Sequence, residues 1–304
     1  MNVWQPESGE TLLARAPVTF ATGAAPHVRG MRWFRDAERN DIQHHLEGWP
    51  DGPSFSPRSI GDTVAHRLLR GVAKVTGVTV MAALGAAGGN VSTPSSADSG
   101  SDTPSDPANE VDDFPVMWAA PGTVGRTLPW QLDPGRADPK HWRTHLIVTD
   151  RRVLVVQLPY DGKKLEAIDD QILWQIPRTE IAAVEPKDFK EGEDFTIEFT
   201  DGSWCRLRCR SRRQLTRYLM RAPELLSVVE LTPAQRKAIL SYAREIEMPD
   251  SVLPLITRNS CGHLNVDILL PKRLTSAFGA SEENILLDEQ GRDVDLSDYH
   301  PEDL

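Results

Sequence analysis

DFTIEFTDGSWCRLRC, residues 194–209, is the stretch that decides the fold. Apolar and polar residues alternate on both sides of Asp201-Gly202, a pair that favours the tight turn of a β-hairpin. The pattern therefore predicts two antiparallel strands, 194–200 and 204–209, joined at that pair.

The chain on both sides of this hairpin carries further short strand and helix patterns. Apolar or alternating stretches predict strands at 9–20, 114–120, 144–150, 152–158, 172–177 and 180–185. A helix is predicted over 211–222, because Leu215, Tyr218 and Leu219 share one face before Pro223 ends the pattern. Antiparallel strands followed by one helix predict an α+β fold. We expect a small antiparallel barrel, or two orthogonal sheets, capped by that C-terminal helix.

An insertion follows the first strand of this predicted barrel. The spacing of apolar residues predicts helices over 28–47 and 62–87. Residues 89–113 contain no aromatic residue and cannot bury enough apolar surface to fold, so we expect disorder there. The predicted units before the C-terminal region are a barrel of 9–20 and 114–222, a helical insertion 21–88 and a disordered linker 89–113.

The C-terminal extension, residues 223–304, combines a helix with an acidic end. Thr232 and the following proline predict the start of a helix over 232–247, and 264–271 has the pattern of a short strand. Residues 282–304 hold nine acidic residues and one arginine, a charge of −8, whereas the whole chain has −10. We expect this acidic tail to be unstructured.

Composition sets the cellular class that we expect. Three cysteines make no disulfide framework, and the first residues lack the pattern of a secretory signal. The apolar run Val75–Ala87 would span about 20 Å as a helix, short of the ~30 Å hydrocarbon core of a bilayer. We therefore expect a cytoplasmic protein without a transmembrane segment, and peripheral membrane contact stays an open alternative.

The second strand of the hairpin begins an arginine-rich stretch, residues 204–221, that contains no aspartate or glutamate. Side chains alternate between the two faces of a strand, which sends Cys205, Leu207 and Cys209 to the core. The intervening residues and the polar face of the following helix are then expected to face solvent. The resulting candidate binding surface, the arginine patch, is Arg206, Arg208, Arg210, Arg213, Arg217 and Arg221, with Trp204 as an apolar contact.

Two interpretations of the arginine patch are open from the sequence. Guanidinium groups bind carboxylates and phosphates in a bidentate manner, so the patch could recognise an anionic partner. It could equally be a solvated face whose charges pair with Glu and Asp of neighbouring strands. A related hypothesis is that the acidic tail folds back onto the patch and competes with that partner.

Three stretches resemble a known family. HLIVTDRRVLVVQL (145–158), ILWQIPRTEIAAVEP (172–186) and the 194–209 hairpin, followed by a helix, resemble the bacterial pleckstrin-homology-like and GRAM-like domains. The resemblance covers about 114–222, with 9–20 as a candidate first strand. It implies a binding or scaffolding role towards lipids, peptides or partner domains, and no enzymatic activity. The short basic loop of phosphoinositide-binding members is replaced here by the long insertion, so that specificity is not carried over.

We therefore predict a non-enzymatic binding or adaptor module without a cofactor, which engages an acidic protein segment or an anionic membrane surface. A nucleic-acid-binding protein would use the same arginines on phosphate, but the chain is acidic and few aromatic residues lie among its basic ones. An enzyme of unknown type is the other alternative. The sequence lacks a phosphate-binding loop, a nucleophile elbow and a His-Glu-x-x-His pair.

Cysteine and histidine residues suggest a metal site that strand geometry argues against. Cys205, Cys209, Cys261 and His263 could in principle supply four ligands. The first two would lie about 13 Å apart on one strand, too far to share a zinc ion with ~2.3 Å bonds. We predict buried thiols and no metal.

Overall fold

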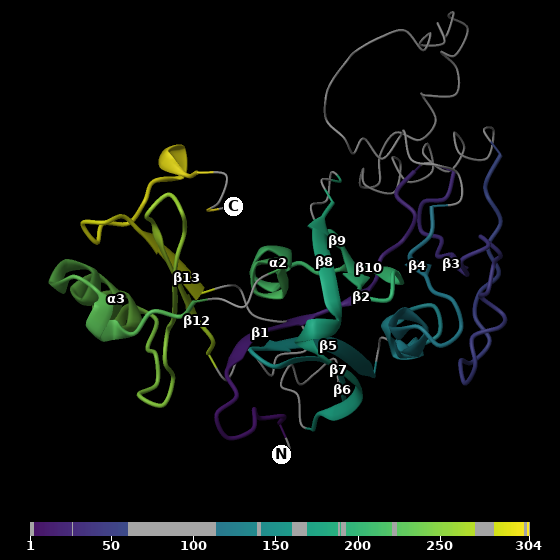
Figure 1. The fold of residues 1–304 in the computed structure, drawn as a ribbon, viewed down its shortest axis with the longest axis horizontal. Coiled ribbons are helices and arrows are strands. Elements are labelled where there is room, and N and C mark those ends of the chain that lie inside the picture. Colours follow the sequence, from purple (N-terminus) through teal and green to yellow (C-terminus); the bar gives the residue numbers. More distant parts are fainter. Residues whose placement is uncertain are drawn as a thin grey trace, which may run out of the picture.

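The computed structural model describes residues 3–25, 27–59, 114–138, 141–159, 169–187, 189, 193–220, 224–270, 283–300 and 303 (Figure 1). Over these residues the protein is a mixed α+β structure in which sheets predominate. The predicted helix 62–87 and the predicted linker 89–113 lie outside them. Among the described residues, no helix combines the length and the apolar character that crossing a bilayer requires.

The first sheet has four antiparallel strands in the order β1-β5-β6-β7. Their bounds are β1 Leu12–Pro17, β5 Trp142–Thr149, β6 Arg152–Pro159 and β7 Gln171–Pro177. Six consecutive residues of β5 and four of β6 are buried, because this sheet is covered on both faces. The tight connection at Asp150-Arg151 sets the register, in which Val148 lies opposite Val153.

The second sheet is built around the 194–209 hairpin. It has the order β3-β4-β10-β9-β8, with β2 also paired to β10. The bounds are β2 Thr19–Phe20, β3 Phe34–Arg35, β4 Met117–Trp118, β8 Ile181–Pro186, β9 Asp194–Phe199 and β10 Trp204–Arg208. The predicted hairpin is confirmed: Trp204 pairs with Glu198, and Gly202 takes the positive φ of 81° that the turn requires.

One continuous run of chain joins the two sheets. β1 pairs with β5, and the chain then passes through Val18 into β2, which pairs with β10. The crossing is fixed by a backbone bond from Val18 N to Thr144 O at 3.0 Å and by the Thr144 hydroxyl, which donates to Val18 O at 2.6 Å. The helix α2 (Arg212–Met220) packs on β1 and β8 and places Leu215, Tyr218 and Leu219 in a core shared by both sheets.

The closed barrel predicted from the sequence is wrong, because the two sheets are open. β7 and β8 do not pair with each other; a short 3₁₀ helix, Arg178–Glu180, lies between them. The edge of β10 opposite β9 pairs with β2 and β4, and β4 pairs in parallel with β3. The second sheet therefore extends outward through β3 and β4. The β1–β2 run and the short link from β7 to β8 connect it to the first sheet.

The helix predicted over 28–47 is also wrong. This segment consists of turns and the short strand β3, and the described residues 27–59 contain no α-helix. The Asp36 carboxylate accepts from the backbone and side-chain nitrogens of Asn40, which competes with helical hydrogen bonding. Arg39 has a left-handed φ of 69°. Ile42 and Leu46 nevertheless join the shared core, so the apolar spacing marks burial and not helix.

The C-terminal residues form a separate small layer, seen to the left of α2 in Figure 1. The helix α3 (Pro233–Glu245) lies beside a three-stranded sheet of β11 (Leu255–Arg258), β12 (Leu264–Ile268) and β13 (Glu283–Leu287). Thr232 caps α3 in a capping box with Gln235. The prediction of an unstructured acidic tail is therefore wrong, because Ile285 and Leu287 supply apolar packing.

Two hydrogen bonds tie this layer to the main core. The Tyr218 hydroxyl donates to Asp267 Oδ2 at 2.6 Å, and Arg217 Nη1 donates to the same oxygen at 3.1 Å. Asp267 is fully buried on β12. Burial raises the pKa of Tyr218 far above its usual range, and the neighbouring carboxylate of Asp267 raises it further, which keeps the hydroxyl a donor.

Glu10 makes folding stability depend on pH. Burial opposes its ionisation, but hydrogen bonds from Arg152, the Glu7 backbone and Thr149 outweigh this and lower the pKa of Glu10 to about 2. Because the folded pKa is depressed, the stabilisation is present above about pH 4.5 and is lost as the pH falls towards 2.

We expect Glu10→Gln to lower the free energy of unfolding by about 2 kcal/mol at neutral pH, with a difference that shrinks towards about pH 3. Urea denaturation of both proteins across this range measures it. Glu7→Gln is the matched control, because the exposed Glu7 contacts the same Arg152. A pH-independent difference for Glu10→Gln would contradict the assignment.

Candidate functional site

The arginine patch predicted from the sequence is divided by the fold. Arg206 was expected on the solvent side of β10, but it is fully buried. Its Nη1 donates to Asp194 Oδ2 at 3.0 Å and its Nη2 to Thr22 O at 2.5 Å. Its guanidinium carbon lies 4.1 Å from the ring centre of Phe114 and 5.2 Å from that of Phe189. Arg206 does lie on the face of β10 opposite Cys205 and Leu207, as predicted. At Arg206, however, the rings of Phe114 and Phe189 cover that face.

The next two arginines of the strand end stay accessible and share one carboxylate. Arg208 Nε donates to Glu193 Oε2 at 2.5 Å, and Arg210 Nε lies 3.9 Å from Glu193 Oε1. The Arg208 side chain is 42% exposed and that of Arg210 is 86% exposed. These two guanidiniums can therefore still meet an external anion.

The helical half of the patch is not one continuous surface. Arg213 is exposed, whereas Arg217 is engaged by Asp267 of the C-terminal layer. Arg221 lies outside the described residues. Trp204 is half-buried and stacks on Trp118, with ring centres 6.4 Å apart and planes 11° apart. Trp204 thus serves the pairing of β4 with β10.

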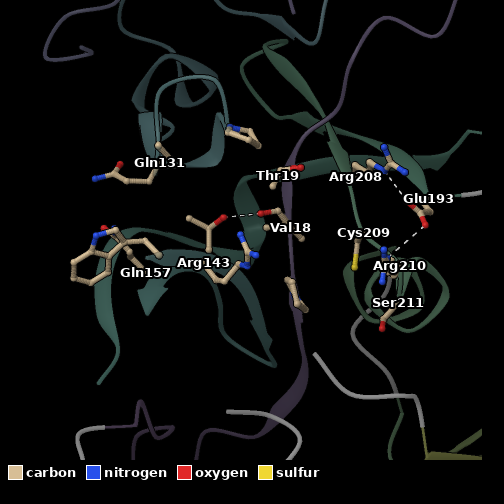
Figure 2. A pocket seen from close by; sticks show the side chains of 15 residues that line it. Val18, Thr19, Gln131, Arg143, Gln157, Glu193, Arg208, Cys209, Arg210 and Ser211 are labelled. Atoms are coloured by element: carbon tan, nitrogen blue, oxygen red, sulfur yellow. Dashed lines mark hydrogen bonds and ion pairs between the residues drawn. The ribbon is translucent and has the colours of Figure 1, made fainter. Parts of the chain in front are cut away.

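A groove at the β1–β2 crossing gathers the accessible arginines, as Figure 2 shows. Its volume is about 430 Å³. Arg208 and Arg210 line it from the end of β10, and Arg143 lines it from the start of β5. Ser211, which directly precedes α2, also lines it. A helix start carries a partial positive charge, so three elements, β10, β5 and α2, contribute to a site that favours anions.

The walls of the groove combine polar and apolar groups. Gln131, Gln157 and Thr19 offer amide and hydroxyl groups. Trp142, which is 41% exposed, and Pro17 offer apolar surface. The described lining residues include three arginines and one acidic residue, Glu193. The arrangement suits a ligand that carries carboxylates on a partly apolar chain.

Sequence reasoning placed Arg208 and Arg210 in the site but missed Arg143 and Gln131. Arg143 directly precedes the predicted strand 144–150, far in the sequence from the arginine patch, and no local pattern indicates that the two meet. The chain crossing at Val18 brings Arg143 close to Arg208 and Arg210, because it places β5 beside the end of β10.

Of the cysteines, Cys205 and Cys209 are buried in the shared core, as predicted. Burial raises the pKa of the Cys205 thiol well above its usual range, so it stays protonated. Cys261 and His263 lie beside Asp303, a residue of the acidic tail, and no local pattern in the sequence predicts this contact.

The chain matches no protein-family model, and comparisons with curated proteins and with solved structures find no significant similarity. The resemblance to pleckstrin-homology-like domains therefore stays a prediction from the sequence.

The buried position of Arg206 predicts that its loss affects stability more than binding. We expect Arg206→Met to lower the free energy of unfolding by about 3 kcal/mol, because the buried ion pair between Arg206 and Asp194 is lost. Arg210→Met, at the exposed strand end, should change it by less than about 0.5 kcal/mol. Chemical denaturation of both variants measures the contrast, and equal effects would contradict the buried assignment.

Proposed function

We propose that the protein is a non-enzymatic binding module that holds an acidic segment of a partner protein in the arginine-lined groove. The observation that carries the proposal is the convergence of Arg143, Arg208 and Arg210 on one groove with a single carboxylate. Charged hydrogen bonds from guanidinium to carboxylate are among the stronger polar contacts. A ligand with several carboxylates would therefore bind this groove with the highest affinity.

The shape of the groove favours a chain segment over a membrane surface. Arg143 and Arg208 come from different sheets and line a concave site, whereas a membrane presents a broad, flat layer of headgroups. Trp142 and Pro17 add apolar wall beside the charges. An extended acidic segment with apolar side chains matches both kinds of contact.

The lining supports binding without chemistry. The described lining residues include no histidine, and the one carboxylate among them, Glu193, is engaged by Arg208 and Arg210. The Cys209 thiol is buried. A nucleophile with an adjacent base is the arrangement that covalent catalysis requires, and these residues do not provide it. A cytoplasmic location suits the three free cysteines.

We expect a fluorescently labelled oligo-glutamate peptide to bind the full-length protein with an affinity that falls as salt is added. Arg143→Gln combined with Arg210→Gln should weaken this binding at least about tenfold, because two charged contacts are lost. Fluorescence anisotropy measures it. Arg213→Gln and Arg244→Gln are matched controls, because both arginines are exposed and neither lines the groove.

Equal weakening by the control variants, or no binding by the natural protein, would contradict the groove as the site. Two other probes separate the alternatives. Tighter binding of single-stranded DNA with the same dependence on Arg143 would favour the nucleic-acid hypothesis. Preferential binding to phosphatidylserine vesicles would favour the membrane surface.

A further inference from the structure

A second group of chemically reactive side chains lies at the far end of the C-terminal layer. Cys261 and His263 belong to the turn between β11 and β12, and Asp303 stands near the end of the chain. One sulfur, one imidazole nitrogen and one carboxylate oxygen from these three residues all lie within 4.8 Å of one another. They combine the three side-chain types that bind transition metals in proteins.

The carboxylate of Asp303 is held in place before any ligand arrives. Its side chain is fully buried. Asn259 Nδ2 donates to its Oδ1 at 2.7 Å, and the backbone nitrogen of His300 donates to its Oδ2 at 2.8 Å. These contacts fix the orientation of a metal-binding oxygen, which is the role of outer-shell partners in metal sites.

The thiol and the imidazole approach this carboxylate from different sides. His263 Nδ1 donates to Asp303 Oδ2 at 2.8 Å, and Cys261 Sγ lies 3.5 Å from Asp303 Oδ1. In a catalytic triad the carboxylate would contact only the histidine. Here both groups converge on Asp303, so the arrangement suits one shared cation better than a relay from thiol to imidazole.

An acidic pocket opens beside the cluster and gives an independent indication of a cation. Its volume is about 510 Å³, and Cys261 and His263 form part of its wall. Among the described residues of that wall, the one arginine or lysine is Arg292, which is bonded to Asp288 at 2.7 Å. The other acidic lining residues are Glu289, Asp293, Asp295 and Asp298. Such a wall raises the local concentration of cations and repels anions.

We propose that Cys261, His263 and Asp303 form a zinc-binding site at the rim of this acidic pocket. Zinc accepts thiolate, imidazole and carboxylate ligands together, whereas magnesium and calcium prefer oxygen alone. Three protein ligands leave a fourth position, which water from the pocket fills. Binding releases the Cys261 proton to solvent, because the thiolate is the ligand, and the neutral His263 ring keeps its one proton on the nitrogen that does not coordinate. The ion would hold the segment that carries Asp303 against the β11–β12 turn.

The test is zinc binding by the full chain, measured by competition with a chromogenic chelator. We expect Cys261→Ser and Asp303→Asn each to weaken binding by more than about 100-fold. His141→Gln is the matched control, because the exposed His141 contacts Asp138 at 2.6 Å without a nearby thiol in the described structure. It should leave the affinity unchanged.

Two further readouts keep the proposal testable if a variant is unstable. Cobalt(II) added to the natural protein should give a thiolate-to-cobalt absorption band that Cys261→Ser abolishes. Zinc should raise the melting temperature of the natural protein and not that of Cys261→Ser, with a chelator reversing the rise. Equal zinc affinity in the natural protein and Cys261→Ser, or no cobalt band, would overturn the proposal. Either result would leave Asp303 with a structural role alone, through its hydrogen bonds to Asn259, His263 and His300.

Discussion

The passage of one chain segment between two sheets is the constraint on which this structure depends. β1 pairs with β5, and within two residues β2 pairs with β10. Val18 stands at the crossing, where its backbone is bonded to Thr144 in both directions. The shared core and the groove follow from this crossing, because it brings the ends of β5 and β10 together. Arg143 and Arg208 belong to different sheets, and this crossing is what places them at one groove.

Arginine has two different roles in this protein. Arg15 is buried and makes two 2.7 Å bonds to Asp170, and Arg206 is buried between Asp194 and two aromatic rings. Such buried charges require a fixed partner, because desolvation is costly. The side chains of Arg208 and Arg210 are instead 42% and 86% exposed, and we propose that they contact a ligand in the groove. Arginine content alone therefore does not define a binding surface.

Strands that alternate strictly or are strongly apolar could be predicted from the sequence. The 194–209 hairpin, β5, β6 and both described helices lie close to their predicted positions. Short strands such as β3 could not be predicted, because two residues are too few to show an alternation of apolar and polar side chains. The prediction of an unstructured acidic tail failed because acidic residues dominate its composition. The few apolar residues, among them Ile285 and Leu287, form only a short alternating pattern, but they lie on β13, which pairs with β12.

The sequence by itself determined the α+β class, the core faces of β10 and α2, and the placement of Arg208 and Arg210 near a strand end. Local periodicity is enough for these features, because each depends on a few neighbouring residues. Only the tertiary structure decided that the sheets stay open, that Phe114 and Phe189 cover Arg206, and which distant residues share a site. Long-range pairing sets these features, and no short stretch of sequence encodes which partner an exposed edge or face will meet.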